Sequence, residues 1–94
     1  FHRYLLLNSN LDEFDFHYNV IEPNATTKDC PEINREGGTK YEFGFVIQGK
    51  LRIELEDDIY ILNPGDCIFF DASKNHSVTN ISNSQAEMIW LMLS

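Results

Sequence analysis

Hydrophobic residues recur at every second position over much of this chain. In the stretch KLRIELEDD (50–58), leucine or isoleucine occupies positions 51, 53 and 55, and charged residues stand between them. Successive side chains of a β-strand point to opposite faces, so this period of two predicts a strand with one buried and one solvated face. Segments rich in β-branched and aromatic residues predict further strands at 14–22, 41–48, 58–63, 66–71, 76–81 and 86–93.

Turn signals separate these predicted strands. They are Gly49-Lys50, Asp57-Asp58, Asn63-Pro64-Gly65, and the polar stretches 72–75 and 82–84. Many short strands at close spacing, without a convincing helical period, predict an all-β antiparallel sandwich or barrel. The one long irregular segment, 23–40, is either a plain surface loop or a loop at the rim of a pocket.

Composition limits the classes of protein that this chain can be. A length of 94 residues leaves room for one domain with one core. The net charge of -8 repels phosphate backbones and anionic membranes, so we expect no direct contact with nucleic acid or a membrane. Cys30 and Cys67 match no metal or redox spacing, and the apolar stretch in residues 1–7 is too short for a signal peptide. We therefore expect a cytoplasmic protein with free thiols.

Two spacings point to a family. In EFGFVIQG, Glu42 is followed by six residues and then Gly49, and in GDCIFFDASKNHSVTN, Gly65 is followed by His76 and then Asn80. This resembles the cupin family, with motifs G-x5-H-x-H-x3-4-E-x6-G and G-x5-P-x-G-x2-H-x3-N. The resemblance implies a double-stranded β-helix, or jelly-roll barrel. We expect residues 1–94 to form a single cupin domain, excised from a longer protein because the chain begins without Met inside a predicted strand.

The chain departs from the family pattern at the metal ligands. The resemblance implies a metal held by three His and one Glu, but the slots for the paired histidines are Arg35, Glu36, Gly37 and Gly38. Asp71 and Ser73 also replace the Pro and the second Gly of the second motif. Two remaining ligands seldom hold a transition metal tightly, so we predict no metal cofactor. His2 and His17 lie in the N-terminal strands, away from the motif spacing, and are weak substitutes.

The resemblance places Glu42 and His76 opposite each other inside the barrel. Either they form the polar floor of a ligand pocket, or they satisfy each other inside a filled barrel. We favour the pocket, because Gly44 shares the face of Glu42 and brings no side chain. Arg35, in a metal-histidine slot at the barrel mouth, and Tyr41, as part of an apolar wall, are the other predicted ligand contacts.

A closer similarity suggests a function. EFGFVIQGKLRIEL, IYILNPGDCIFFDASKNHSVTN and AEMIWLML resemble the C-terminal sensor cupin of lambda-repressor-like helix-turn-helix regulators. This implies a non-catalytic regulatory domain that binds a small molecule. The alternative is a small metal-dependent cupin enzyme, an isomerase or oxygenase, with a non-standard site; a purely structural barrel is a weaker third possibility. The apolar opening strand FHRYLLL would be an exposed edge in a monomer, so we expect a homodimer through residues 1–7 and the outer sheet.

Overall fold

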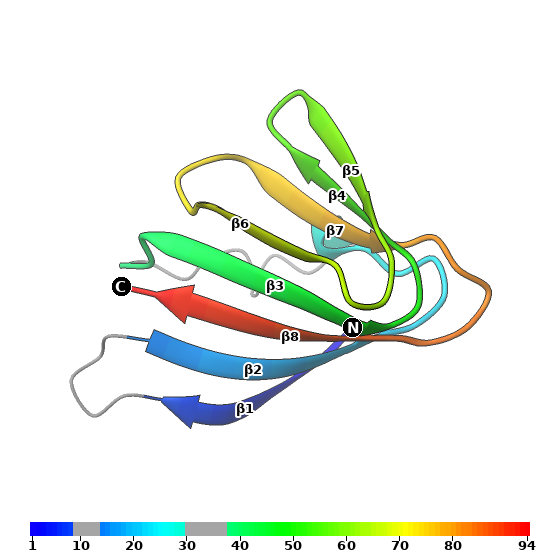
Figure 1. Cartoon of the computed structure of the whole chain (residues 1–94), viewed down its shortest axis with the longest axis horizontal. Coiled ribbons are helices and arrows are strands. Elements are labelled where there is room, and N and C mark those ends of the chain that lie inside the picture. Colours follow the sequence, from blue (N-terminus) through cyan, green and yellow to red (C-terminus); the bar gives the residue numbers. More distant parts are fainter. Residues whose placement is uncertain (9–13, 30–37) are drawn as a thin grey trace.

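The computed structural model describes residues 1–8, 14–29 and 38–94 (Figure 1). The described elements are β1 (His2–Asn8), β2 (Phe14–Ile21), the 3-10 turn η1 (Thr27–Asp29), β3 (Tyr41–Gln48), β4 (Leu51–Leu55), β5 (Asp58–Leu62), β6 (Cys67–Asp71), β7 (His76–Asn80) and β8 (Ala86–Leu93). The predicted all-β class is confirmed. The strands predicted at 14–22, 41–48, 58–63, 66–71, 76–81 and 86–93 end within one residue of the observed strands, whereas in the stretch 50–58 strand β4 ends at Leu55.

The strands form two antiparallel sheets that face each other (Figure 1). The large sheet has the order β1-β2-β8-β3-β6, and the small sheet has the order β5-β4-β7. Strand β8 lies between β2 and β3, so the last strand of the chain joins the N-terminal pair to the rest of the large sheet. This arrangement confirms the double-stranded β-helix.

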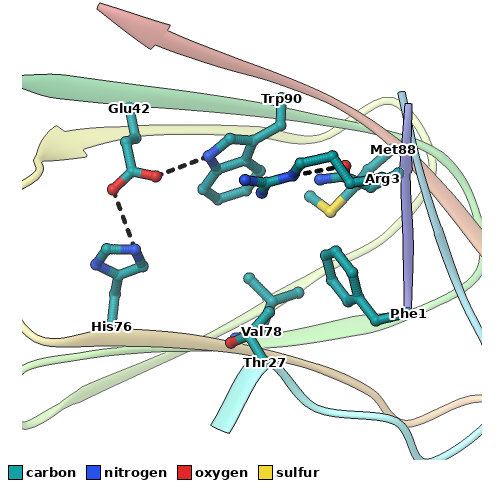
Figure 2. A pocket seen from close by; sticks show the side chains of 9 residues that line it. Phe1, Arg3, Thr27, Glu42, His76, Val78, Met88 and Trp90 are labelled. Carbon is teal, nitrogen blue, oxygen red and sulfur yellow. Dashed lines mark hydrogen bonds and ion pairs between the residues drawn. The ribbon is translucent and has the colours of Figure 1, made fainter. Parts of the chain in front are cut away.

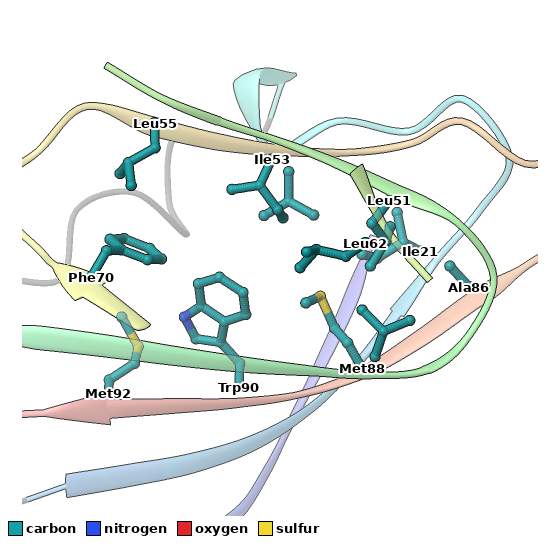
Figure 3. Close-up of a cluster of buried hydrophobic side chains, with 12 residues drawn as sticks. Ile21, Leu51, Ile53, Leu55, Leu62, Phe70, Ala86, Met88, Trp90 and Met92 are labelled. Atoms are coloured by element: carbon teal, nitrogen blue, oxygen red, sulfur yellow. The ribbon is translucent and has the colours of Figure 1, made fainter. Parts of the chain in front are cut away.

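The hydrophobic core fills the space between the sheets (Figure 3). In β4 and β8, buried residues alternate strictly with partly exposed ones, as the period of two in the sequence requires. The buried hydrophobic residues are Ile21, Val46, Leu51, Ile53, Leu55, Leu62, Phe70, Val78, Ala86, Met88, Trp90 and Met92. Burial of this apolar surface is the main favourable term in folding.

The described start of the irregular segment runs along β7. Asn24 donates its backbone N–H to the carbonyl of Asn80 at 2.9 Å, and Asn80 donates back to Ala25 at 3.0 Å. The hydroxyl of Thr27 accepts the backbone N–H of Val78 at 2.9 Å. These bonds close the edge of the small sheet and bring Thr27 to the interior.

The buried Asn80 of the second motif has a structural role. Its side-chain amide donates to the carbonyls of Ile21 and Ser84 at 2.9 and 2.8 Å, and its side-chain oxygen accepts the backbone N–H of Ser82. The residue therefore joins β2, β7 and the turn before β8. Among the described residues, none forms a helix long and apolar enough to cross a lipid bilayer.

Candidate functional site

A buried carboxylate lies at the polar end of the interior. Glu42 is on the inner face of β3 and is 4% exposed. Its Oε1 accepts the indole N–H of Trp90 at 2.8 Å, and its Oε2 lies 3.0 Å from Nε2 of His76 (Figure 2). A charge in an apolar interior is tolerated when each of its oxygens has a donor. Strands β3, β7 and β8 thus each contribute one side chain to a hydrogen-bonded triad.

The imidazole of His76 faces an acceptor on both sides. Its Nδ1 lies 2.9 Å from the carbonyl oxygen of Lys74, and its Nε2 faces Glu42. Neutral imidazole has one N–H, so two acceptors require either the imidazolium or a protonated carboxylate. Burial lowers the pKa of His76, but its hydrogen bonds to Glu42 and Lys74 and the charge of Glu42 together outweigh burial, so the pKa is raised. The raised pKa favours the imidazolium form of His76, which can donate to both acceptors.

A small cavity adjoins the triad (Figure 2). The space that a water-sized sphere can enter is about 20 Å³. Apolar lining comes from Phe1, Val78, Met88 and the ring of Trp90. A volume of this size holds one or a few water molecules, so an organic ligand has to displace a lining side chain in order to enter.

The remaining polar lining includes a residue that the sequence analysis missed. Arg3 points from β1 into the cavity, where its Nε donates to the Asn19 side-chain oxygen at 3.1 Å (Figure 2). Its positive charge lowers the pKa of His76, against the larger effects above. The signal in the sequence is an arginine among the large hydrophobic residues of HRYLLL, but only the pairing of β1 with β2 places it beside Asn19.

The structure brings together some of the predicted site residues and not others. Glu42 and His76 are in contact, as the resemblance implies. Tyr41 lies on the outer face of β3, where it stacks on Phe69 with 5.5 Å between ring centroids, because neighbouring strand residues point to opposite faces. Tyr41 is therefore not part of this cavity. Arg35 lies outside the described residues.

Gly44 does not leave the space that the sequence analysis expects. The ring of Trp90 lies directly over it, and a methyl group at position 44 would overlap that ring. The glycine thus makes room for the indole that donates to Glu42. Its small size serves the triad rather than an open pocket.

The residues present do not fit the metal that the cupin pattern implies. Among the described residues there is no group of three or more metal-ligating side chains. Nε2 of His76 faces Oε2 of Glu42, so this imidazole has to give up its contact with the carboxylate before it can bind an ion, and Oε1 of Glu42 already accepts the indole N–H of Trp90. His2 is exposed beside Glu22, and His17 is buried in β2.

The fold and the position of the Glu42–His76 pair define a cupin jelly roll. The family model for the cupin domain, Cupin_2, matches residues 20–92, and the chain belongs to this family. The cupin domain of an XRE family transcriptional regulator from Enterobacter cloacae is 20% identical, covers 99% of this chain and 95% of its own, and superposes with a TM-score of 0.82.

Other solved structures show the same fold. A Cupin 2 conserved barrel domain protein from Salinispora arenicola is 16% identical over 98% of this chain and 74% of its own, with a TM-score of 0.77. The Cnp3 cupin domain from Schizosaccharomyces pombe is 10% identical over 98% of this chain and 59% of its own, with a TM-score of 0.80. Comparison with curated protein sequences gives no match.

Proposed function

We propose that this chain is a regulatory cupin domain that binds a small molecule at the polar end of its interior and carries out no metal-dependent reaction. The observation that carries the proposal is the triad of Trp90, Glu42 and His76, whose polar atoms are bonded to one another at the position where the family pattern expects metal ligands. A hydrogen-bonded triad of this kind can contact a bound small molecule, but it provides no set of free ligands for a catalytic metal ion.

The cavity beside the triad supports a particular kind of ligand. Its polar lining consists of Arg3, Asn19, Thr27, Glu42 and His76, and apolar side chains supply the rest. Such a lining suits a small molecule with one polar end and one short apolar end. The ligand has to be small, because it enters by displacing Phe1 or Arg3 from a space of about 20 Å³.

The regulatory part of the proposal has two supports. The sequence motifs resemble the sensor cupins of helix-turn-helix regulators, and the similar Enterobacter cloacae structure is the cupin domain of an XRE family transcriptional regulator. The genomic sequence upstream of Phe1 tests this part directly. A helix-turn-helix pattern within about 60 residues supports it, and an unrelated domain there contradicts it.

Thermal melts with a panel of small organic molecules test binding. At a free concentration of about 100 times Kd, a ligand stabilises the protein by about 2.7 kcal/mol, which a melting curve detects. Arg3→Gln should remove the ligand-dependent shift, whereas the matched change His2→Gln, on the exposed neighbouring position, should retain it. Absence of any ligand-dependent shift in the parent contradicts the proposal.

The metal-dependent alternative has its own measurement. Protein incubated with Fe, Mn, Ni and Zn salts and then desalted is analysed for bound metal. We expect far less than one ion per chain. A stoichiometric ion that is lost in Glu42→Gln would replace the regulatory proposal with the enzyme.

A further inference from the structure

Strand β5 combines a free edge with an apolar sequence. It lies at the end of the small sheet and, among the described residues, it pairs with β4 on one side only (Figure 1). Its sequence, DIYIL, is a continuous apolar run after Asp58, whereas the neighbouring β4, LRIEL, alternates apolar and charged residues. A strand with apolar residues on both faces is typical of the interior of a sheet, where both faces are covered.

The structure leaves this apolar run uncovered. Ile59 and Ile61 lie on the outer face of the small sheet and are 63% and 44% exposed. Tyr60, on the opposite face, is 43% exposed. An edge strand also presents backbone N–H and C=O groups that have no partner in its own sheet. A segment that covers β5 therefore has to supply both backbone hydrogen bonds and apolar side chains, and an added β-strand supplies both.

The other edges of the two sheets differ from β5. Segment 24–27 forms hydrogen bonds along β7 and closes the far edge of the small sheet. Strand β1 has a register shift between Leu5 and Leu7, and an irregularity of this kind protects an edge from pairing. In β6, exposed residues alternate with less exposed ones. Of the edge strands that the structure describes, β5 alone combines an unbroken register with apolar residues exposed on both faces.

The hairpin turn that begins β5 is acidic. Glu56, Asp57 and Asp58 are exposed there, and none of them forms an ion pair with a cationic side chain of the described residues. The nearby Glu54 is paired with Lys28 at 2.8 Å. Complementary charge favours and speeds association, so the covering strand should carry Lys or Arg. A second copy of this chain is less suitable, because it carries the same net charge of -8.

We propose that β5 is a docking edge for an extended, positively charged segment of another polypeptide, which joins the small sheet as an additional strand. Apolar side chains of this segment pack on Ile59 and Ile61 on one face and on Tyr60 on the other. Its Lys or Arg residues lie near the acidic turn at Glu56 and Asp57. The proposal goes beyond the binding of a small molecule in the interior and does not depend on it.

Selection from a displayed library of random peptides, each about ten residues long, tests the proposal. We expect the parent to select peptides with alternating apolar residues and an excess of Lys and Arg. Affinity for a selected peptide should fall about 10-fold or more in Ile61→Lys, because a lysine interrupts the apolar run and repels the basic peptide. The matched control, Leu5→Lys, makes the same change of charge at an exposed residue on the edge of the large sheet. It should bind the peptide nearly as tightly as the parent.

Two further measurements test the backbone pairing and the charge separately. Amide hydrogen exchange followed by NMR should become slower within β5 when the selected peptide binds. The double variant Glu56→Gln, Asp57→Asn should weaken binding several-fold at low ionic strength. This difference should disappear at about 1 M salt, where exposed charges are screened. Circular dichroism and thermal melts establish that each variant is folded.

Three results would overturn the proposal. The first is a selection that enriches no peptide for the parent over Ile61→Lys, or that enriches peptides without excess Lys and Arg. The second is a selected peptide that binds without slowing amide exchange in β5, because strand addition requires backbone pairing. The third is protection of the β5 amides that rises with protein concentration in the absence of peptide and is lost in Ile61→Lys. That result would assign the edge to a second copy.

Discussion

The interior of this barrel has two ends that are built from the same strands but differ in chemistry. At one end, Val46 on β3 and Ala86 on β8 lie in a fully buried apolar cluster. At the other, Glu42 on β3 and Trp90 on β8 meet His76 in the hydrogen-bonded triad. Positions two and four residues apart on one strand share a face, so the change from apolar to ionic occurs within a few residues.

This difference indicates what each end contributes to the stability and the function of the domain. Apolar burial at the first end supplies favourable free energy without depending on precise geometry. The triad at the second end is tolerated because every buried polar atom of Glu42 has a donor, and it loses that compensation if one partner is removed. We therefore expect the apolar end to determine stability and the polar end to determine binding.

The largest effect is expected at the apolar end. Leu51→Ala should destabilise the fold by about 2 to 5 kcal/mol, because Leu51 is fully buried and its truncation leaves a cavity. Urea unfolding followed by tryptophan fluorescence measures this loss. Any ligand-dependent shift in the melting temperature should persist in the variant. A loss below about 1 kcal/mol would contradict the assignment of the main core to this end.

An intermediate effect is expected from His76→Ala at the polar end. It leaves Oε2 of Glu42 without its donor, and the cost should be about 1 to 3 kcal/mol, because the 19% exposure of the His76 side chain allows water to compensate in part. In a background of Glu42→Gln, the same change should cost less. A double-mutant cycle by urea unfolding measures this coupling, and a coupling energy near zero would show that the pair is not ionic.

The smallest effect is a dependence on pH. The raised pKa of His76 means that its stabilising contribution is fully present below the ordinary value of 6.5 and is lost as pH rises through the raised pKa. The charged and titratable groups that act on it are Glu42 and Arg3. The stability advantage of the parent over His76→Gln should therefore be greater at about pH 5.5 than at about pH 8.5.

His17 provides the control with the opposite sign. Burial is the largest cause that lowers the pKa of His17. The charge of Arg3 lowers this pKa further, and the charge of Asp15 raises it. Protonation of His17 therefore opposes folding, and its contribution to stability improves as pH rises from the lowered pKa to about 6.5. His17→Gln should flatten this part of the parent profile. Equal and parallel pH profiles for all three proteins would contradict both assignments.

The sequence predicts the strands well because alternation is a local property. The ranges 41–48 and 86–93 match β3 and β8 at both ends. The contact between Glu42 and His76 was implied by the resemblance to the cupin motifs. The sequence did not predict the position of Arg3 in the cavity or the role of Gly44, because both depend on the order of the strands in the sheet. Arg3 needs β1 beside β2, and the Trp90 ring over Gly44 needs β8 beside β3.

The central place of β8 has a consequence for synthesis in the cell. The large sheet is interrupted between β2 and β3 until the segment Ala86–Leu93 has been made, because β8 pairs with both of them. A nascent chain that lacks this segment carries two strands with unpaired edges beside apolar surface, and such intermediates are prone to aggregate. Pairing over such long sequence separations also slows folding. We infer that this domain completes its fold only after its final strand has left the ribosome, so a translational stall upstream of Ala86 yields an unfolded product.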